Sequence, residues 1–117
     1  MQNYKGAVKI ILVLFLVFFI AACGQTQEQS SAVEASDSAS VEINNFQFIP
    51  DTVTIKRGGT VTWLQKDSVA HTVAIKDIEP SPVLNNGDTW SYSFDKTGNY
   101  NYICSIHPAM KGKIIVK

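Results

Sequence analysis

The segment Cys104-Ser-Ile-His-Pro-Ala-Met110 places a thiol, an imidazole and a thioether at intervals of three residues. The chain has only two histidines and two methionines, and one methionine is the initiator. Each candidate alone has a commonplace explanation, because a buried Cys or Met often fills a core and a His on an apolar face is often a satisfied core residue. The coincidence of His71, His107, Met110 and Cys104 in one pattern is what indicates a metal site.

A thiolate, two imidazoles and a thioether form a soft to borderline ligand set. Two His and one Cys with a weak axial Met are the ligands of blue-copper electron-transfer sites. Zinc also accepts Cys and His, but Met is a poor zinc ligand, and calcium and magnesium require oxygen ligands. One thiolate with two neutral imidazoles leaves a net charge of only +1 on oxidised copper, so such a centre can be buried at moderate cost.

The elements that must position these residues show a period of two. Apolar and polar residues alternate, with enrichment in β-branched and aromatic side chains, which predicts strands. Clusters of Gly, Asn and Asp separate them, and no window has a helical period. The expected strands are 52–56, 60–65, 70–75, 89–94, 98–104 and 113–117. We therefore expect residues 41–117 to form an all-β domain, an antiparallel Greek-key β-sandwich.

The candidate ligands take defined positions in this frame. Cys104 closes a strand on its inward face, and His107 and Met110 lie in the connection to the last strand. His71 lies on the inward face of an earlier strand. Alternation alone does not establish that His71 meets the other three, but their inward positions make a common site the expectation.

The N-terminus has the features of an export signal. Lys5 and Lys9 precede the 13-residue apolar run Ile10–Ala22, which is shorter than the roughly 20 residues that a spanning helix needs. The motif Ile-Ala-Ala-Cys-Gly resembles a bacterial lipobox, which implies a lipoprotein signal peptide over 1–22 and lipid on Cys23. A short N-terminal membrane anchor is the alternative.

Residues 23–40 are expected to be the lipidated Cys and a flexible, disordered linker. The segment Gly24–Ser40 is rich in Ser, Gln and Ala and contains no aromatic residue, so it cannot bury enough apolar area to offset its ordering entropy. With Cys23 lipidated, Cys104 has no disulfide partner. A lone thiol outside the cytoplasm is a liability unless it is buried or holds a metal.

Two stretches carry a family resemblance, "GGTVTWLQKDSVAHTV" and "GNYNYICSIHPAM". They resemble the cupredoxins, in the plastocyanin and amicyanin-like branch, and the match covers residues 41–117. The resemblance implies one type 1 copper ion on His71, Cys104, His107 and Met110. Many members have Asn directly after the first His, where it ties two ligand loops together; this chain has Thr72, whose hydroxyl can also donate a hydrogen bond.

The function expected from these features is that of a membrane-tethered, extracytoplasmic electron carrier and not an enzyme. Redox protein partners would dock transiently near His107, and we expect a monomer. Ten basic and ten acidic residues give no net charge, so nothing suggests a nucleic-acid partner. A copper-trafficking or copper-storage protein and a metal-free binding sandwich are the alternatives. A binuclear copper domain would need a second Cys in the ligand loop.

Overall fold

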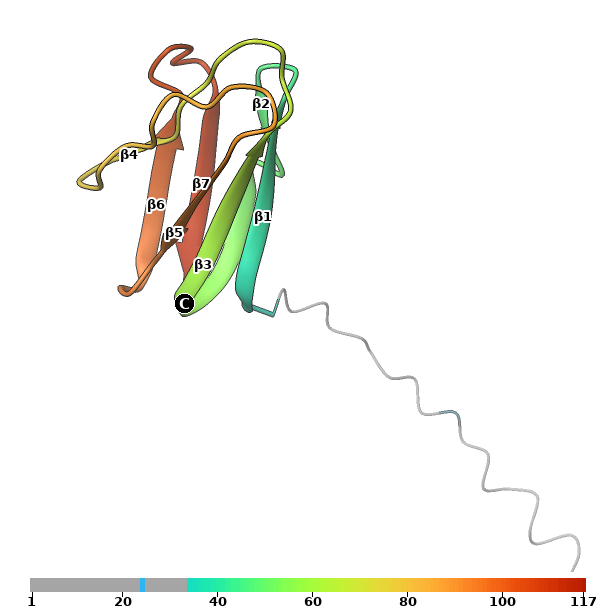
Figure 1. Cartoon of the computed structure of the whole chain (residues 1–117). Helices are drawn as coiled ribbons and strands as arrows, with labels where there is room; N and C mark the ends of the chain where they lie inside the picture. The colour runs from blue at the N-terminus through green and yellow to red at the C-terminus, as the bar shows by residue number, and fades with distance from the viewer. Residues whose placement is uncertain (1–23, 25–33) are drawn as a thin grey trace, which may run out of the picture. The chain divides into compact units, whose positions relative to one another are not determined.

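The computed structural model describes Gly24 and residues 34–117. The predicted signal peptide, Cys23 and most of the predicted linker lie outside the described residues. The described part contains seven strands and no helix, and hence no helix with the length and apolar character to cross a membrane (Figure 1). The strands are β1 Ser36–Asn44, β2 Gln47–Ile49, β3 Thr52–Gln65, β4 Ala74–Ile75, β5 Thr89–Ser93, β6 Gly98–Ile103 and β7 Lys111–Val116.

The strand pairing is mixed. β1 is antiparallel to β2 and parallel to the second part of β3, while β7 is parallel to the first part of β3 and antiparallel to β6. β5 pairs antiparallel with the second part of β3, and β4 pairs antiparallel with β6. The all-β sandwich is confirmed, but a wholly antiparallel pairing is wrong. The alternation of apolar and polar residues identifies a strand but does not show which strands lie beside it. The neighbours depend on whether the connecting segment stays in one layer of the sandwich or crosses to the other.

A bend within β3 makes these two sets of neighbours compatible. Gly58 has a φ of 84°, which residues with a Cβ rarely adopt, and its N–H bonds to the carbonyl of Phe94. Residues 52–55 on one side of the bend pair with β7, and residues 60–64 on the other side pair with β5. β3 therefore belongs to both halves of the sandwich (Figure 1).

The domain begins earlier than the sequence pattern predicts. β1 starts at Ser36, so the predicted boundary at Val41 is five residues late and residues 36–40 are not linker. The side chains of this first part are mostly exposed, which is why no apolar alternation marks it. Its order comes from the backbone, which pairs with β3 at Ser36↔Ile55 and, after a register shift, from Ser38↔Thr60 onward.

The core fills the interior with the residues that alternation assigned to the inward faces. Val53, Ile55, Val61 and Trp63 of β3 are all buried, as expected. Tyr102 of β6 packs edge-on against Trp63, with ring centroids 5.6 Å apart. Burial raises the pKa of Tyr102 to about 12, so its hydroxyl remains protonated inside the core.

The candidate ligands lie on connections at the end of the strands opposite the C-terminus (Figure 1). The strand expected over 70–75 is reduced to β4 and an isolated bridge between His71 and Leu84. Residues 66–73 and 104–110 thus leave the sheet at this end and carry the donor side chains as loops.

The close fit of Tyr102 on Gly112 generates a test of the fold. The two residues are paired across β6 and β7, and a Cβ at position 112 would overlap the buried Tyr102 ring. We expect Gly112→Ala to lower the free energy of unfolding by about 1–3 kcal/mol, because a packed core tolerates added volume poorly. Denaturant unfolding measures this, with Lys111→Ala on the exposed surface of β7 as the control. Equal stability of both variants would contradict the packing described.

Candidate metal centre

The backbone N–H and carbonyl of His71 both form hydrogen bonds with Leu84. Its N–H donates to the carbonyl of Leu84 at 3.1 Å, and the Leu84 N–H donates back at 2.8 Å. The side chain is fully buried. Its Nε2 lies 2.9 Å from Oδ2 of Asp67, and its Nδ1 lies 3.7 Å from Sγ of Cys104. The two ring nitrogens of His71 thus face different partners, the Asp67 carboxylate at Nε2 and the Cys104 sulfur at Nδ1.

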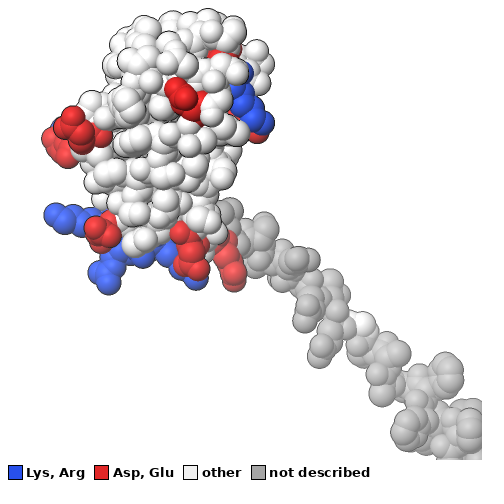
Figure 2. All heavy atoms as spheres, in the orientation of Figure 1, with Lys and Arg blue, Asp and Glu red and all other residues white. Residues whose placement is uncertain are grey.

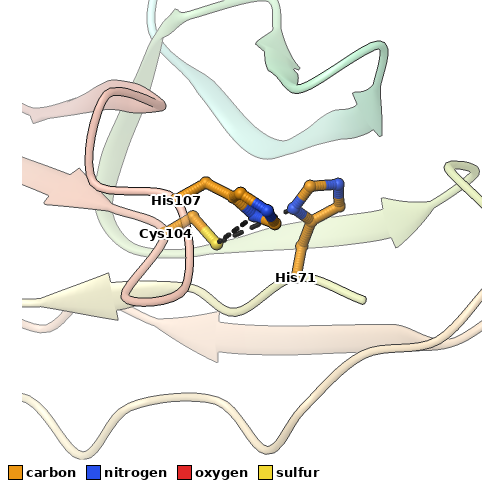
Figure 3. Close-up of side chains that lie close together, drawn as sticks. All are labelled: His71, Cys104 and His107. Carbon is orange, nitrogen blue, oxygen red and sulfur yellow. Dashed lines mark hydrogen bonds between the residues drawn. The ribbon is translucent and has the colours of Figure 1, made fainter. Parts of the chain in front are cut away.

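Cys104 directly follows β6 and is completely buried, a free thiol in the described part of the chain. Its N–H donates to the carbonyl of Met110 at 3.2 Å, which closes the loop between β6 and β7. Nδ1 of His107 lies 3.9 Å from the sulfur. Figure 3 shows the two imidazoles converging on the sulfur from different segments.

The donor atoms of His71, Cys104 and His107 all lie within 4.8 Å of one another. With metal–nitrogen and metal–sulfur bonds of about 2.1 and 2.3 Å, as in zinc sites, a nitrogen and a sulfur at trigonal angles on one ion lie roughly 3.8 Å apart. The two nitrogen–sulfur distances are 3.7 and 3.9 Å. Both nitrogen–sulfur distances therefore fit a single ion, and folding joins the distant imidazole of His71 to the C-terminal pair.

Met110 is 4% exposed, and its backbone is hydrogen-bonded to the backbones of Cys104 and His107. Its N–H donates to the carbonyl of His107 at 2.9 Å, and its carbonyl accepts from Cys104. The residue with the thioether thus sits at the closing point of the same loop. Met110 would therefore be available to hold a soft ion together with the other three residues.

Thr72 does tie the two ligand-bearing segments together. Its hydroxyl oxygen accepts the N–H of Ser105 at 2.9 Å and lies 2.7 Å from the Ser105 hydroxyl. Its own N–H donates to Sγ of Cys104 at 3.4 Å. The Thr72 hydroxyl therefore connects the two segments, as an acceptor of the Ser105 N–H.

Sequence reasoning missed Asp67 and Phe46. The Phe46 N–H and the His71 ring both donate to the Asp67 carboxylate and lower its pKa. The Phe46 ring lies edge-on against both imidazoles. No spacing rule marks Asp67, because residues 66–73 form a loop, and only the hairpin of β1 with β2 brings Phe46 to the site.

The hydrogen bonds around Cys104 change its acidity. Burial alone raises the pKa of the thiol, but the Thr72 N–H, His71 and His107 oppose this effect and bring the pKa down from 9.0 to about 6. A thiolate is the form that binds metals. The site is therefore a closed arrangement of one thiolate and two imidazoles, suited to hold a soft or borderline ion and offering no separate catalytic acid or nucleophile among these residues.

Comparison with known proteins agrees with the cupredoxin resemblance seen in the sequence. A family model of the cupredoxin-like domain matches residues 10–116. Amicyanin-alpha of Methylorubrum extorquens is 33% identical over 111 residues, which are 87% of this chain and 92% of that protein.

Solved structures agree in fold. A purple cupredoxin from Nitrosopumilus maritimus is 33% identical, covers 68% of this chain and 99% of its own, and has a TM-score of 0.65. A copper-containing nitrite reductase from Thermus scotoductus, also 33% identical, has a TM-score of 0.63, and the match spans 68% of this chain but only 22% of the reductase. In the reductase the similarity is thus to one part of a larger protein.

The lowered pKa of Cys104 yields a test on the metal-free protein. We expect thiolate absorbance at 240 nm to appear with a midpoint near pH 6, well below the value of about 8.5 for an unperturbed thiol. A depressed folded-state pKa also makes ionisation stabilise the fold above the unfolded pKa, and this stabilisation is lost as the pH falls toward 6. Subtracting the titration of Cys104→Ser isolates this thiol from Cys23. A midpoint at 8.5 or above contradicts the hydrogen-bonding pattern.

Proposed function

This chain belongs to the cupredoxin family, and from that membership we propose that it binds one type 1 copper ion through His71, Cys104, His107 and Met110 and carries one electron at a time between redox partners. The observation that carries the proposal is the convergence of three donor atoms within 4.8 Å from two segments far apart in the sequence. The buried Met110, fixed at the end of the ligand loop, completes the set.

The protein's contribution is to hold the donors in one arrangement. Copper, when bound, supplies the one-electron couple between Cu(II) and Cu(I). His71 is oriented by Asp67 through Nε2, and the sulfur of Cys104 accepts a hydrogen bond from the Thr72 N–H. Full burial of His71 and Cys104 excludes water from this side of the site. Donors that do not move between oxidation states keep the structural cost of electron transfer low.

His107 is the proposed route for the electron because it is the ligand that reaches the surface. It is partly exposed, whereas His71 and Cys104 are fully buried. Ile106 beside it is 47% exposed. In the view of Figure 2 the end of the domain that carries the ligand loops is mostly uncharged, and charged side chains gather at the other end. A small, weakly charged face of this kind supports brief docking of a redox protein.

Experiments can distinguish an electron carrier from a copper-trafficking or copper-storage protein and from an enzyme. A copper-trafficking or storage protein would hold its ion at open, exchangeable coordination, whereas this site has two fully buried donors. The nitrite reductase match means that the same domain also occurs within an enzyme. A reversible one-electron couple in the isolated protein, with no transfer of copper to a chelator on the same timescale, supports the carrier.

We expect the copper-loaded protein to bind one ion per chain and to absorb intensely in the visible when oxidised, with a blue colour from the thiolate ligand. Cys104→Ser should abolish the band, because it removes the sulfur that produces it. Met110→Leu should retain the colour and shift the reduction potential, as expected for a weak axial ligand. Asn101→Ala, on the exposed face of β6, is the control. A colourless Cu(II) complex of the unmodified protein, or colour that survives in Cys104→Ser, contradicts the proposal.

We also propose that the domain is tethered to a membrane outside the cytoplasm. The support is in the sequence, where two lysines and a 13-residue apolar run precede Ile-Ala-Ala-Cys-Gly. The peptide 1–22 would be removed and Cys23 would carry lipid. Several acyl chains on one residue give stable anchoring, which a single chain does not.

The two cysteines provide a matched test of the tether. We expect the full-length protein, expressed in a bacterium, to partition into the detergent phase and to show a mass consistent with an acylated N-terminal Cys23. Cys23→Ala should lose the mass of the acyl chains and keep residues 1–22, because both lipid attachment and removal of the signal peptide require this cysteine. Cys104→Ser should show the same acylated mass as the unmodified protein. An unmodified protein without acyl mass on Cys23, or with residues 1–22 still attached, would rule out the lipid on this residue.

A further inference from the structure

Phe46 occupies a backbone position that is unfavourable for its residue type. The pairing Asn44↔Gln47 leaves Asn45 and Phe46 as the two-residue loop between β1 and β2. Their φ angles are 51° and 57°, the combination found in type I′ hairpin turns. Gly is strongly preferred at the second position of such a turn, and a residue with a Cβ is disfavoured there. A local rule broken in this way points to a role for the side chain.

The Phe46 ring contacts both imidazoles of the metal centre. Its centroid lies 5.4 Å from that of His71 at 89° and 5.0 Å from that of His107 at 86°. Both are edge-to-face arrangements, the favoured geometry for aromatic pairs. The imidazoles themselves are 5.0 Å apart. One ring therefore restrains two donors that come from different segments of the chain.

Phe46 also forms part of the outer wall of the centre. Its side chain is 48% exposed, whereas His71 beneath it has no exposed surface. The ring thus has one side toward solvent and another against the imidazoles. Removing it would open the site to water at the point where the two imidazoles meet.

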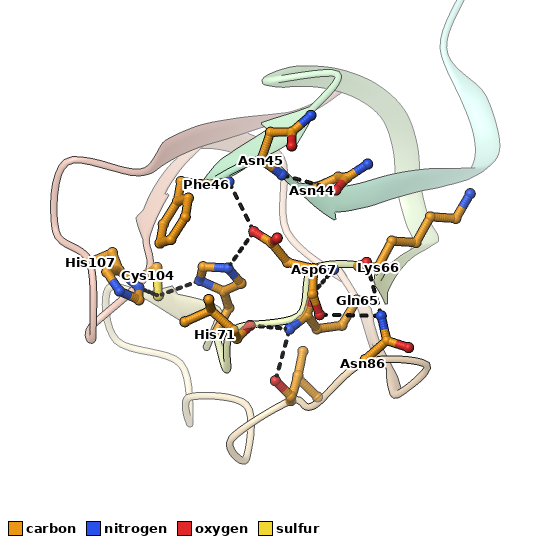
Figure 4. Close-up of polar contacts among 12 residues, drawn as sticks. Asn44, Asn45, Phe46, Gln65, Lys66, Asp67, His71, Asn86, Cys104 and His107 are labelled. Carbon is orange, nitrogen blue, oxygen red and sulfur yellow. Dashed lines mark hydrogen bonds and ion pairs between the residues drawn. The ribbon is translucent and has the colours of Figure 1, made fainter.

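A single carboxylate oxygen connects the turn to the ligand. Oδ2 of Asp67 accepts the Phe46 N–H at 3.0 Å and the His71 Nε2–H at 2.9 Å (Figure 4). Asp67 is itself held, because its N–H donates to Oε1 of the buried Gln65 at 2.6 Å and its carbonyl accepts from Asn86 at 3.2 Å. The position of Phe46 is therefore coupled to the orientation of His71.

We propose that Phe46 is a positioning residue that fixes the planes of both imidazoles and closes the metal centre to solvent, and that Asp67 clamps it to His71. This inference rests on the proposed copper site. The proposal explains why a Phe is found at a φ of 57°, where Gly would remove the backbone strain.

Three variants of the full-length protein separate this role from simple packing. Phe46→Gly removes the ring and suits the turn, Phe46→Tyr keeps the ring, and Asn45→Gly relaxes the neighbouring turn position without touching the ring. After loading with copper, loss of the ion to an excess of chelator is measured. We expect Phe46→Gly to lose copper about tenfold faster, equivalent to about 1.4 kcal/mol, with an altered electron paramagnetic resonance spectrum. Phe46→Tyr and Asn45→Gly should remain within about twofold.

Measurements on the metal-free protein provide the second readout. We expect nuclear Overhauser contacts between the Phe46 ring and both imidazoles, and a melting temperature for Phe46→Gly no lower than that of the unmodified protein. Unchanged copper loss in Phe46→Gly overturns the proposal, as does a melting temperature that falls in step with faster loss. If the unmodified protein forms no coloured copper complex, the proposed function fails, while the ring contacts still test the packing by themselves.

The clamp has its own test in Asp67→Asn, which keeps the size of the side chain and removes its charge. A carboxylate beside the centre favours Cu(II) over Cu(I), so we expect the reduction potential to rise. Asp88→Asn, an exposed carboxylate in the turn before β5, is the control and should leave the potential unchanged. An equal potential in Asp67→Asn and the unmodified protein would remove Asp67 from the proposal.

Discussion

The metal centre depends on a hydrogen-bonded connection between two segments that are 33 residues apart in the sequence. The Ser105 N–H donates to the Thr72 hydroxyl oxygen at 2.9 Å, and the Thr72 N–H donates to the sulfur of Cys104 at 3.4 Å. Neither segment is within a regular strand at this point, so the sheet alone does not fix their separation. These contacts hold the segment with His71 against the segment with Cys104.

The sandwich makes that connection possible because its strands deliver both segments to the same end. β6 carries Cys104 to this end, and the bridge between His71 and Leu84 holds the other loop there. The buried side chain of Gln65 connects the two bridged segments locally, because its Nε2 donates to the carbonyls of Val69 and Leu84. Because each loop is braced by its own bonds, the donors can keep one arrangement without relying on the ion to impose it.

Much of the fold, and the meeting of His71 with Cys104 and His107, was predictable from the sequence, for identifiable reasons. Alternation in residues 52–65 marks inward faces because one side of each strand must be buried, and the rarity of His and Met makes their spacing with Cys104 informative. The parallel pairings, the start of β1 at Ser36 and the shortness of β4 were not predictable. These features depend on which strands form backbone hydrogen bonds with each other in the tertiary structure. The pattern of side chains along the sequence does not report this.

The arrangement of the two ends of the domain bears on how a tethered carrier would work. The chain enters β1 near Ser36, which pairs with Ile55, and the C-terminal Lys117 donates to the carbonyl of the same Ile55. β1 then runs to the hairpin that carries Phe46, so the entry point and the metal centre lie at opposite ends of the strand. A lipid on Cys23 would therefore attach the domain by the end remote from His107. The ligand face, with its small charge and partly exposed imidazole, would remain open to a partner, and the turn that begins at the far end of β1 would control how much solvent reaches it.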